Sequence, residues 1–304
     1  MEIASQKTVR PWRLSNFDAF LMSIVVVAIS SSGPIIALST APVLAMAVWR
    51  CVFASVLTFP FAWVKHGFAN LTKSQLRGCL LAGLALAIHF CLWIPSVRLT
   101  SVANSVALVA TQPIWMLLMT KRLGNHVPRR VWWGICVAIS GVLIVVGVDF
   151  GISGQALLGD AMSLLSAAAA GAYLMIGGKV REAVSNSVYT VIVYAVSAVV
   201  IGMVAVSLNT PLWGFSQRDW LLIFTLTIGA QLLGHSLMSR LMQNTTPAVV
   251  GIAVLFEPPG AAIFAALLLH QHLDFAAIFG MAVILVGLVI VVWQSNDEQT
   301  GDLL

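Results

Sequence analysis

A carboxylate followed by two prolines stands in the middle of a long apolar segment of this chain. Glu257 lies within the apolar run 248–269, and Pro258 and Pro259 follow it directly. A carboxylate at the centre of a membrane helix costs about 2.5 to 3.5 kcal/mol on insertion scales, so it normally faces a partner or an aqueous cavity. Prolines remove backbone donors at the same depth. The combination predicts a binding or coupling site at the membrane midplane, or else a packing kink with a protonated carboxyl.

The first half of the chain carries a related pair. Gln112 precedes Pro113 as Glu257 precedes Pro258. Each pair lies roughly eleven residues, or about 16 Å, into its expected helix, which is near the middle of a hydrocarbon core about 30 Å thick. Pro113, Pro258 and Pro259 are therefore expected to mark helix breaks beside a central cavity.

Arg50 is a cation inside the apolar segment 43–64. Its guanidinium could clamp a substrate carboxylate, or it could keep Glu257 charged by pairing with it. Because Arg50 lies only a few positions inside the expected helix, its long side chain could instead reach the membrane surface. All of these interpretations stay open at this point.

Histidines occur in the third expected helix of each half, at His89 and His235. A histidine changes charge near neutral pH, so either one, together with Glu257, could accept and release a coupling proton. A neutral imidazole bonded between helices is the other interpretation. Further candidates for cavity lining are aromatic and amide side chains, which interfacial placement or interhelical hydrogen bonds would also explain: Trp93, Trp115, Asn104 and Gln231.

These residues stand in a chain of 304 residues that is 60% hydrophobic and 9% charged. That balance is typical of an integral membrane protein. The formal charge of +5 comes from basic residues scattered among short loops, without a dense stripe of cations and aromatics, so no nucleic acid partner is expected. The four cysteines lie in apolar segments without metal-ligand spacing, so neither a metal nor another cofactor is expected.

Apolar segments long enough to cross a bilayer recur along the whole chain. They predict an all-α integral membrane protein with ten transmembrane helices, at about 17–38, 43–64, 77–97, 101–120, 131–148, 159–178, 187–207, 219–239, 246–269 and 275–293. Most Lys and Arg residues lie in alternate connections, and only Arg98 and Arg218 lie in the others. Since positive residues are retained in the cytoplasm, both termini are predicted to be cytoplasmic, in a multi-pass protein of the inner (plasma) membrane.

The two halves of the chain repeat a pattern. Residues 100–113 align with 245–258, and Gly134 and Gly141 align with Gly280 and Gly287. Because each repeat has an odd number of helices, the second must be inserted upside down relative to the first, a plan found in secondary transporters. The expected parts are an N-terminal cytoplasmic tail 1–16, a five-helix repeat 17–148, an external linker 149–158, a second repeat 159–293 and a C-terminal cytoplasmic tail 294–304.

Several segments of both halves follow a family pattern. In the second half they are the Gly-Asp opening at 159–180, the Thr-Thr-Pro-Ala to Glu-Pro run at 245–258, and the glycine-spaced last helix. In the first half they are 30–38, Trp49 with Arg50, and 89–113. These segments resemble the ten-helix EamA proteins of the drug/metabolite transporter superfamily. The resemblance implies export or exchange of small metabolites, often amino acids or related compounds, by alternating access between two halves. Asn125 and Gln271 stand where many relatives have a glutamate.

The sequence and this resemblance together predict a secondary transporter that exports a small polar or amphipathic metabolite, acting as a monomer or homodimer. Proton-coupled uptake or exchange is the alternative within the same class. An enzyme is not expected, because the sequence has no Gly-x-Ser-x-Gly, His-Glu-x-x-His or paired-carboxylate pattern. A membrane-embedded enzyme or a sensor is the alternative from another class.

Overall fold

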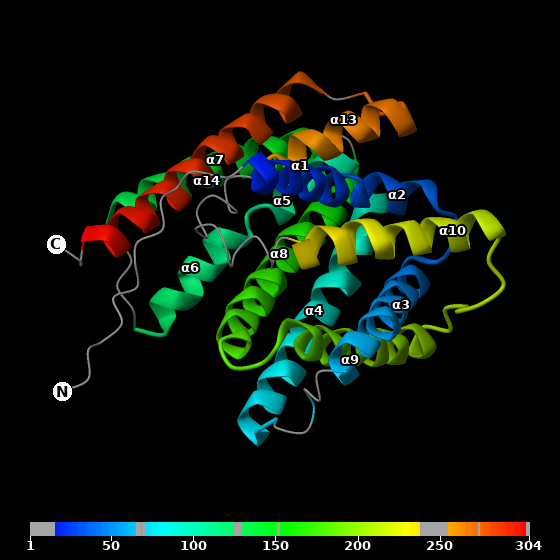
Figure 1. Ribbon diagram of the computed structural model, residues 1–304. Helices are drawn as coiled ribbons and strands as arrows, with labels where there is room; N and C mark the ends of the chain where they lie inside the picture. The colour runs from blue at the N-terminus through cyan, green and yellow to red at the C-terminus, as the bar shows by residue number, and fades with distance from the viewer. Residues whose placement is uncertain are drawn as a thin grey trace, which may run out of the picture.

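The computed structural model describes residues 16–64, 68, 71–124, 129–150, 153–237, 255–272 and 274–301. Every regular element in this part of the chain is a helix, which confirms the expected all-α class. The elements, shown in Figure 1, are α1 (Asn16–Ser30), α2 (Ser32–Leu38), α3 (Val43–Val64), α4 (Lys73–Leu99), α5 (Val102–Val109), α6 (Gln112–Arg122), α7 (Arg129–Phe150), α8 (Gly154–Arg181), α9 (Asn186–Ser207), α10 (Gln217–Leu226), the π-helix η1 (Thr227–Ser236), α13 (Glu257–Leu269) and α14 (Phe275–Gly301).

Among the described residues, six helical stretches are long and apolar enough to cross a membrane. They are Asn16–Leu38, Val43–Val64, Lys73–Leu99, Val102–Arg122, Gly154–Arg181 and Asn186–Ser207. Shorter apolar helical stretches occur at Val131–Gly147, Glu257–Leu269 and Phe275–Val291. Large apolar side chains such as Trp63, Trp133 and Phe275 are more than half exposed, as side chains that face lipid would be. The start of the ninth expected helix lies outside the described residues.

Two of the spans are discontinuous. The first changes from α1 to α2 at Ser31, and the fourth changes from α5 to α6 at residues 110–111. Pro34 lies in the first turn of α2, and Pro113 lies in the first turn of α6. Proline lacks a backbone N–H group, so it interrupts the hydrogen bonds of a helix that would continue through it. In the first turn of a helix that N–H group is not needed, so each proline is compatible with the start of a new helix.

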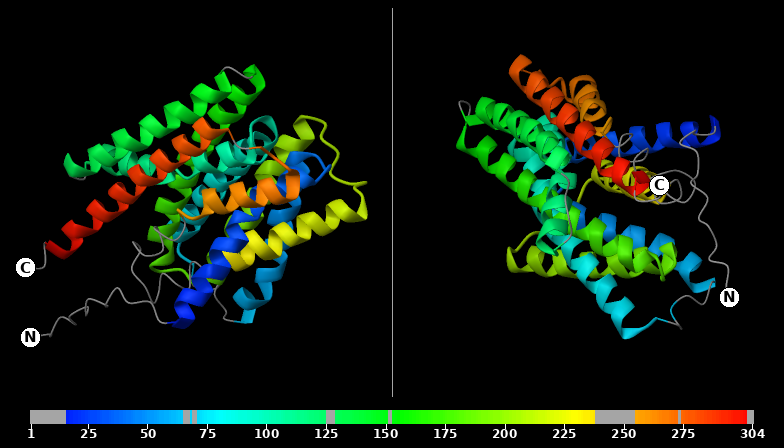
Figure 2. Two further views of the ribbon diagram at one scale, coloured as in Figure 1. Left: turned by 90° about the horizontal axis from the view of Figure 1, so that it is seen from above. Right: turned by 90° about the vertical axis from the view of Figure 1, so that its left-hand side faces the viewer.

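The helices pack in pairs that link distant parts of the chain. α7 packs along α14 at one end of the molecule and α3 packs along α9 at the other, as Figures 1 and 2 show. Between them α4 packs against α8, and α1 packs against η1. Each pair joins one helix that precedes the connection between α7 and α8 with one that follows it. The packing of the two halves against each other therefore builds the centre of the bundle.

Four glycines bring α7 and α14 close together. A Cβ atom on Gly134 would lie 2.8 Å from the carbonyl oxygen of Gly287, and one on Gly141 would lie 2.7 Å from that of Gly280. Only glycine permits the two backbones to approach so closely. In the sequence alignment Gly134 corresponds to Gly280 and Gly141 to Gly287. Gly134 thus contacts the counterpart of Gly141, and Gly141 contacts the counterpart of Gly134.

Candidate functional site

Arg50 lies inside the bundle. Its side chain is only 1% exposed, and its Nε atom donates a hydrogen bond to Oε1 of Gln231 at 2.6 Å. The guanidinium carbon lies 4.3 Å from the centre of the Phe90 ring. The charge therefore does not reach the membrane surface, and no hydrogen bond or ion pair in the described part of the chain joins it to Glu257.

Two donors of the Arg50–Gln231 pair have no acceptor. Nη1 of Arg50 and Nε2 of Gln231 are both buried, and neither has a hydrogen-bond partner among the described residues. Gln231 is fully buried and belongs to η1, a π-helix of ten residues. π-helical segments are rare and frequently occur at functional sites. The fold therefore joins two predicted site residues that are far apart in the sequence.

His89 and Trp93 stack on each other within α4. Their ring centroids are 5.7 Å apart and their planes differ by 11°. Nδ1 of His89 lies 3.1 Å from the carbonyl oxygen of Ser166 and 3.3 Å from its hydroxyl, on the neighbouring α8. The histidine is thus bonded between two helices. It also lies next to Phe90, with ring centroids 5.1 Å apart, so it adjoins the Arg50 site.

Gln112 and Asn104 lie on either side of the break in the fourth span. Gln112 is the first residue of α6 and Pro113 the second. Asn104 is buried in α5, where its backbone N–H is capped by the hydroxyl of Ser101 at 3.0 Å. The polar residue before the proline therefore marks the start of a half-helix inside the bundle, where exposed N–H groups and the helix dipole favour negative charge.

Glu257 occupies the matching place in the second half. It is the first residue of α13, followed by Pro258 and Pro259 in the first turn. The hydroxyl of Ser30, the last residue of α1, donates to the backbone carbonyl of Glu257 at 3.3 Å. The start of α13 is thus held at the break in the first span. His235 lies near the end of η1, and its side chain is outside the described part.

Three buried hydroxyls that the sequence analysis did not single out join α4, α5 and α8. The Oγ atoms of Ser96 and Ser105 lie 2.9 Å apart, and Ser163 donates to them at 2.9 and 3.1 Å. All three side chains are fully buried. Small hydroxyl residues of this kind let helices pack closely and bond to one another, so the cluster fixes the position of α8 against the first half.

A second unforeseen group is the carboxylate of Asp219, in the first turn of α10. It is 4% exposed and accepts hydrogen bonds from the hydroxyl of Ser39 at 2.7 Å, the backbone N–H and hydroxyl of Thr40 at 2.7 and 2.8 Å, and the hydroxyl of Ser216 at 2.7 Å. Bonds to an ionised acceptor are the strong ones. The Ser-x-x-Asp spacing before an apolar run is the sequence signal that identifies such a cap. Asp219 therefore ties α10 to the connection between α2 and α3.

Three further hydrogen bonds lie on the same side of the bundle. Nη2 of Arg98, at the end of α4, donates to the carbonyl oxygens of Ser39 and Ile36 at 2.6 and 3.3 Å. Nε1 of Trp49 donates to the carbonyl of Leu212 at 2.7 Å. We call these contacts, together with those of Asp219, the Asp219 clamp. It lies on the side predicted to be external.

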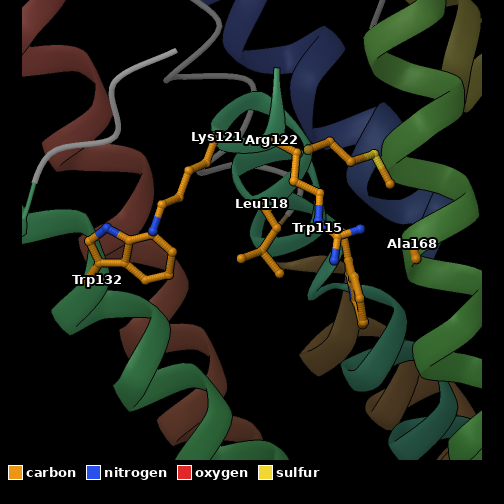
Figure 3. A pocket seen from close by; sticks show the side chains of 7 residues that line it. Trp115, Leu118, Lys121, Arg122, Trp132 and Ala168 are labelled. Carbon is orange, nitrogen blue, oxygen red and sulfur yellow. The ribbon is translucent and has the colours of Figure 1, made fainter. Parts of the chain in front are cut away.

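A pocket of about 630 Å³ opens on the side predicted to be cytoplasmic. Its lining comes from α6, α7 and α8: Trp115, Leu118, Met119, Lys121, Arg122, Trp132 and Ala168. Figure 3 shows Lys121 reaching over the Trp132 ring, with Nζ 4.4 Å from the ring centre, and Arg122 pointing toward Trp115. Trp115, less than one turn after Gln112, thus lines a pocket that extends along α6 to its end.

A family model now decides the class of protein. The model described as the EamA-like transporter family matches residues 17–147 and 157–293. The chain belongs to this family. The match covers both expected repeats and confirms the resemblance found in the sequence. As an EamA-family protein it is a multi-pass membrane transporter, which places it in the lipid bilayer with a small molecule as its substrate.

No curated protein matches the chain. Among solved structures, one titled only "Crystal structure of protein" is 12% identical, with a TM-score of 0.64, and the alignment covers 90% of this chain and 96% of that one. At this identity the likeness shows a shared fold alone. It extends over nearly the whole EamA-family chain.

Proposed function

We propose that this EamA-family protein is a secondary transporter that exports a small polar or amphipathic metabolite, an amino acid or related compound, across the inner membrane. Its ten helices would form two inverted halves that expose a central site alternately to each side. The observation that carries the proposal is Arg50, a fully buried cation between helices of the two halves, with a donor that no described residue satisfies. A permanent charge is costly to bury, so it is normally retained for function.

The close contact of α7 with α14 supports the inverted arrangement. A two-fold axis in the membrane plane that exchanges Gly134 with Gly280, and Gly141 with Gly287, turns the Gly134–Gly287 contact into the Gly141–Gly280 contact. Both contacts are present. The paired half-helix starts at Gln112 and Glu257 follow the same relation.

The difference between the predicted external and cytoplasmic sides of the bundle supports alternating access. The Asp219 clamp closes the predicted external side, while a pocket opens at the predicted cytoplasmic side. In this conformation a metabolite would approach from the cytoplasm, which agrees with export. Glu257 and Arg50 would be the central polar groups, and His89, Trp93, Gln112, Asn104, Gln231 and His235 would line the path.

Proton-coupled uptake or exchange is the second candidate. It is favoured by Glu257 and His89, two groups able to exchange protons at the depth of the helix breaks. The Ser166 contacts of His89 fit a structural role as well.

The proposal is tested with purified protein in proteoliposomes. Efflux and uptake are measured for a panel of amino acids and other small metabolites, with and without an imposed pH gradient. We expect saturable flux for at least one compound, and loss of that flux in Glu257→Ala protein that still elutes as a folded species. Absence of flux for every compound would contradict transport of this substrate class and favour a membrane-embedded enzyme or a sensor.

A further inference from the structure

We propose that Arg50 and Gln231 form a carboxylate-binding site, and that the metabolite carried by the protein bears a carboxylate. This inference rests on the proposed transport function and adds the chemical group that the central site recognises. Three features of the site point to a carboxylate: the charge of Arg50, the positions of its contacts and the two donors left without described acceptors.

The charge of Arg50 needs an anion. A guanidinium stays protonated in proteins, and that of Arg50 is buried with an exposed fraction of only 1%. Its described contacts are the amide oxygen of Gln231 and the ring of Phe90. The side chains of Cys51 and Tyr194 also lie near the guanidinium, and none of these groups is a carboxylate. An uncompensated buried charge is strongly unfavourable. Water could satisfy the free hydrogen bonds but would not neutralise the charge.

The two unsatisfied groups are both donors, and they belong to one polar centre. The 2.6 Å bond between Arg50 Nε and Gln231 Oε1 holds the two side chains together. It leaves Nη1 of the arginine and Nε2 of the glutamine without described acceptors. A carboxylate offers two acceptor oxygens and a negative charge, and paired N–H donors bind it with charge-assisted hydrogen bonds. An ammonium group at this place would be repelled by the charge of Arg50, and it could not accept a hydrogen bond from either free donor.

The surroundings of the pair are suited to a ligand site. Phe90 covers one face of the guanidinium at 4.3 Å, so the free donors project from the edge. Arg50 comes from α3, and Gln231 comes from η1 in the other half. A carboxylate held by both side chains would therefore connect the two halves, and its arrival or departure would change the attraction between them.

The test uses matched sets of ligands that differ only at the carboxylate. Leucine, leucinamide and isoamylamine form one set; phenylalanine, phenylalaninamide and phenethylamine form another; 2-oxo acids with their amides form a third. Binding is measured on purified full-length protein from the rise in melting temperature with ligand concentration. In at least one set we expect the acid to bind about tenfold or more tightly than its amide, because the amide lacks the charge that Arg50 requires.

A pair of variants separates binding from folding. Gln231→Glu places a carboxylate beside Arg50, so we expect a higher melting temperature without ligand and loss of acid binding. Gln231→Met keeps the length of the side chain but has no donor, so we expect acid binding to weaken about tenfold without a rise in melting temperature. Acid binding by Gln231→Glu at the wild-type level would overturn the proposal. So would amides that bind as tightly as acids, or a complete panel without acid binding.

The two proposals can fail separately. Saturable flux of amines or neutral compounds, with no preference for acids, would leave transport standing and remove the carboxylate site. Acid binding that depends on Gln231, with no flux of any bound acid in proteoliposomes, would leave the site standing and remove transport of these compounds.

Discussion

Arg50 and Glu257 lie in the same apolar interior but are held by different contacts. Arg50 is held by an amide and an aromatic ring, with no carboxylate among its described contacts. Glu257 stands at the first position of α13, where the helix dipole favours a negative charge. The two ionisable groups are thus positioned by separate contacts, so a change at one is expected to leave the other in place.

Glu257→Gln tests the coupling role of the carboxylate. The amide keeps the size of the side chain but can neither ionise nor bind and release a coupling proton. For a proton-coupled mechanism we expect flux that no longer responds to a pH gradient, while substrate binding is retained. The measurement compares flux in proteoliposomes with and without the gradient. Wild-type transport and binding in this variant would exclude Glu257 from the mechanism.

Two kinds of contact hold the helices of the bundle together. The serine cluster and the glycine contacts involve short side chains or none, so they hold helices at one spacing. In the Asp219 clamp, hydrogen bonds join the connection between α2 and α3 to α10, where the Trp49 ring also packs against that of Trp220. Since hydrogen bonds to water can replace these contacts once the side opens, this connection is suited to a gate.

Asp219→Asn is expected to open that gate more often, because the neutral amide forms weaker hydrogen bonds and brings two donors. The reporter is Ala41→Cys, a position 2% exposed in the closed arrangement, in protein whose native cysteines are replaced. We expect several-fold faster labelling by an impermeant maleimide. Asp274→Asn is the matched control, since Asp274 is exposed and the hydrogen bond described for its carboxylate comes from the nearby backbone N–H of Ala276. Equal labelling rates in all three proteins would show that the clamp does not control access.

Gly134→Ala is expected to destabilise the contact between α7 and α14. The new Cβ would lie within 2.9 Å of backbone atoms of α14, and overpacking of this kind costs about 1 to 3 kcal/mol. Gly147→Ala, on the same helix, is the control because no described atom of another helix lies within 4 Å of its Cβ position. Thermal unfolding in detergent should show a lower melting temperature for the first variant only. A similar change in both would assign the effect to helix propensity rather than to packing.

The charge of the connections predicts how the helices are oriented across the membrane, with both termini in the cytoplasm. Leu208 and Leu123 are similarly exposed, at 64% and 65%, and lie at the ends of α9 and α6. With both termini in the cytoplasm, Leu208→Cys is expected to react with an impermeant maleimide in intact cells. Leu123→Cys should react only after the membrane is permeabilised. The reverse pattern would contradict the predicted orientation.

The pattern of apolar segments alone determined the class and the bounds of most helices. In a bilayer the backbone must bond within its own segment, so length and hydropathy are enough to mark a helix. The polar-Pro pairs likewise indicated where half-helices begin, because proline acts locally on the backbone. The family could also be inferred from the sequence, because the motifs that carry the resemblance are short stretches in which the spacing of Gly, Pro and Glu residues can be read directly.

Tertiary structure decided which polar residues meet. Helix rotation is weakly encoded in segments that are apolar on most faces, so the sequence left the pairing of Arg50 open between Glu257 and a substrate. The fold placed Gln231 beside Arg50 and bonded His89 to Ser166. It also assembled the Asp219 clamp from connections far apart in the chain. These contacts depend on how distant helices cross, and the packing of side chains across the two halves fixes that geometry.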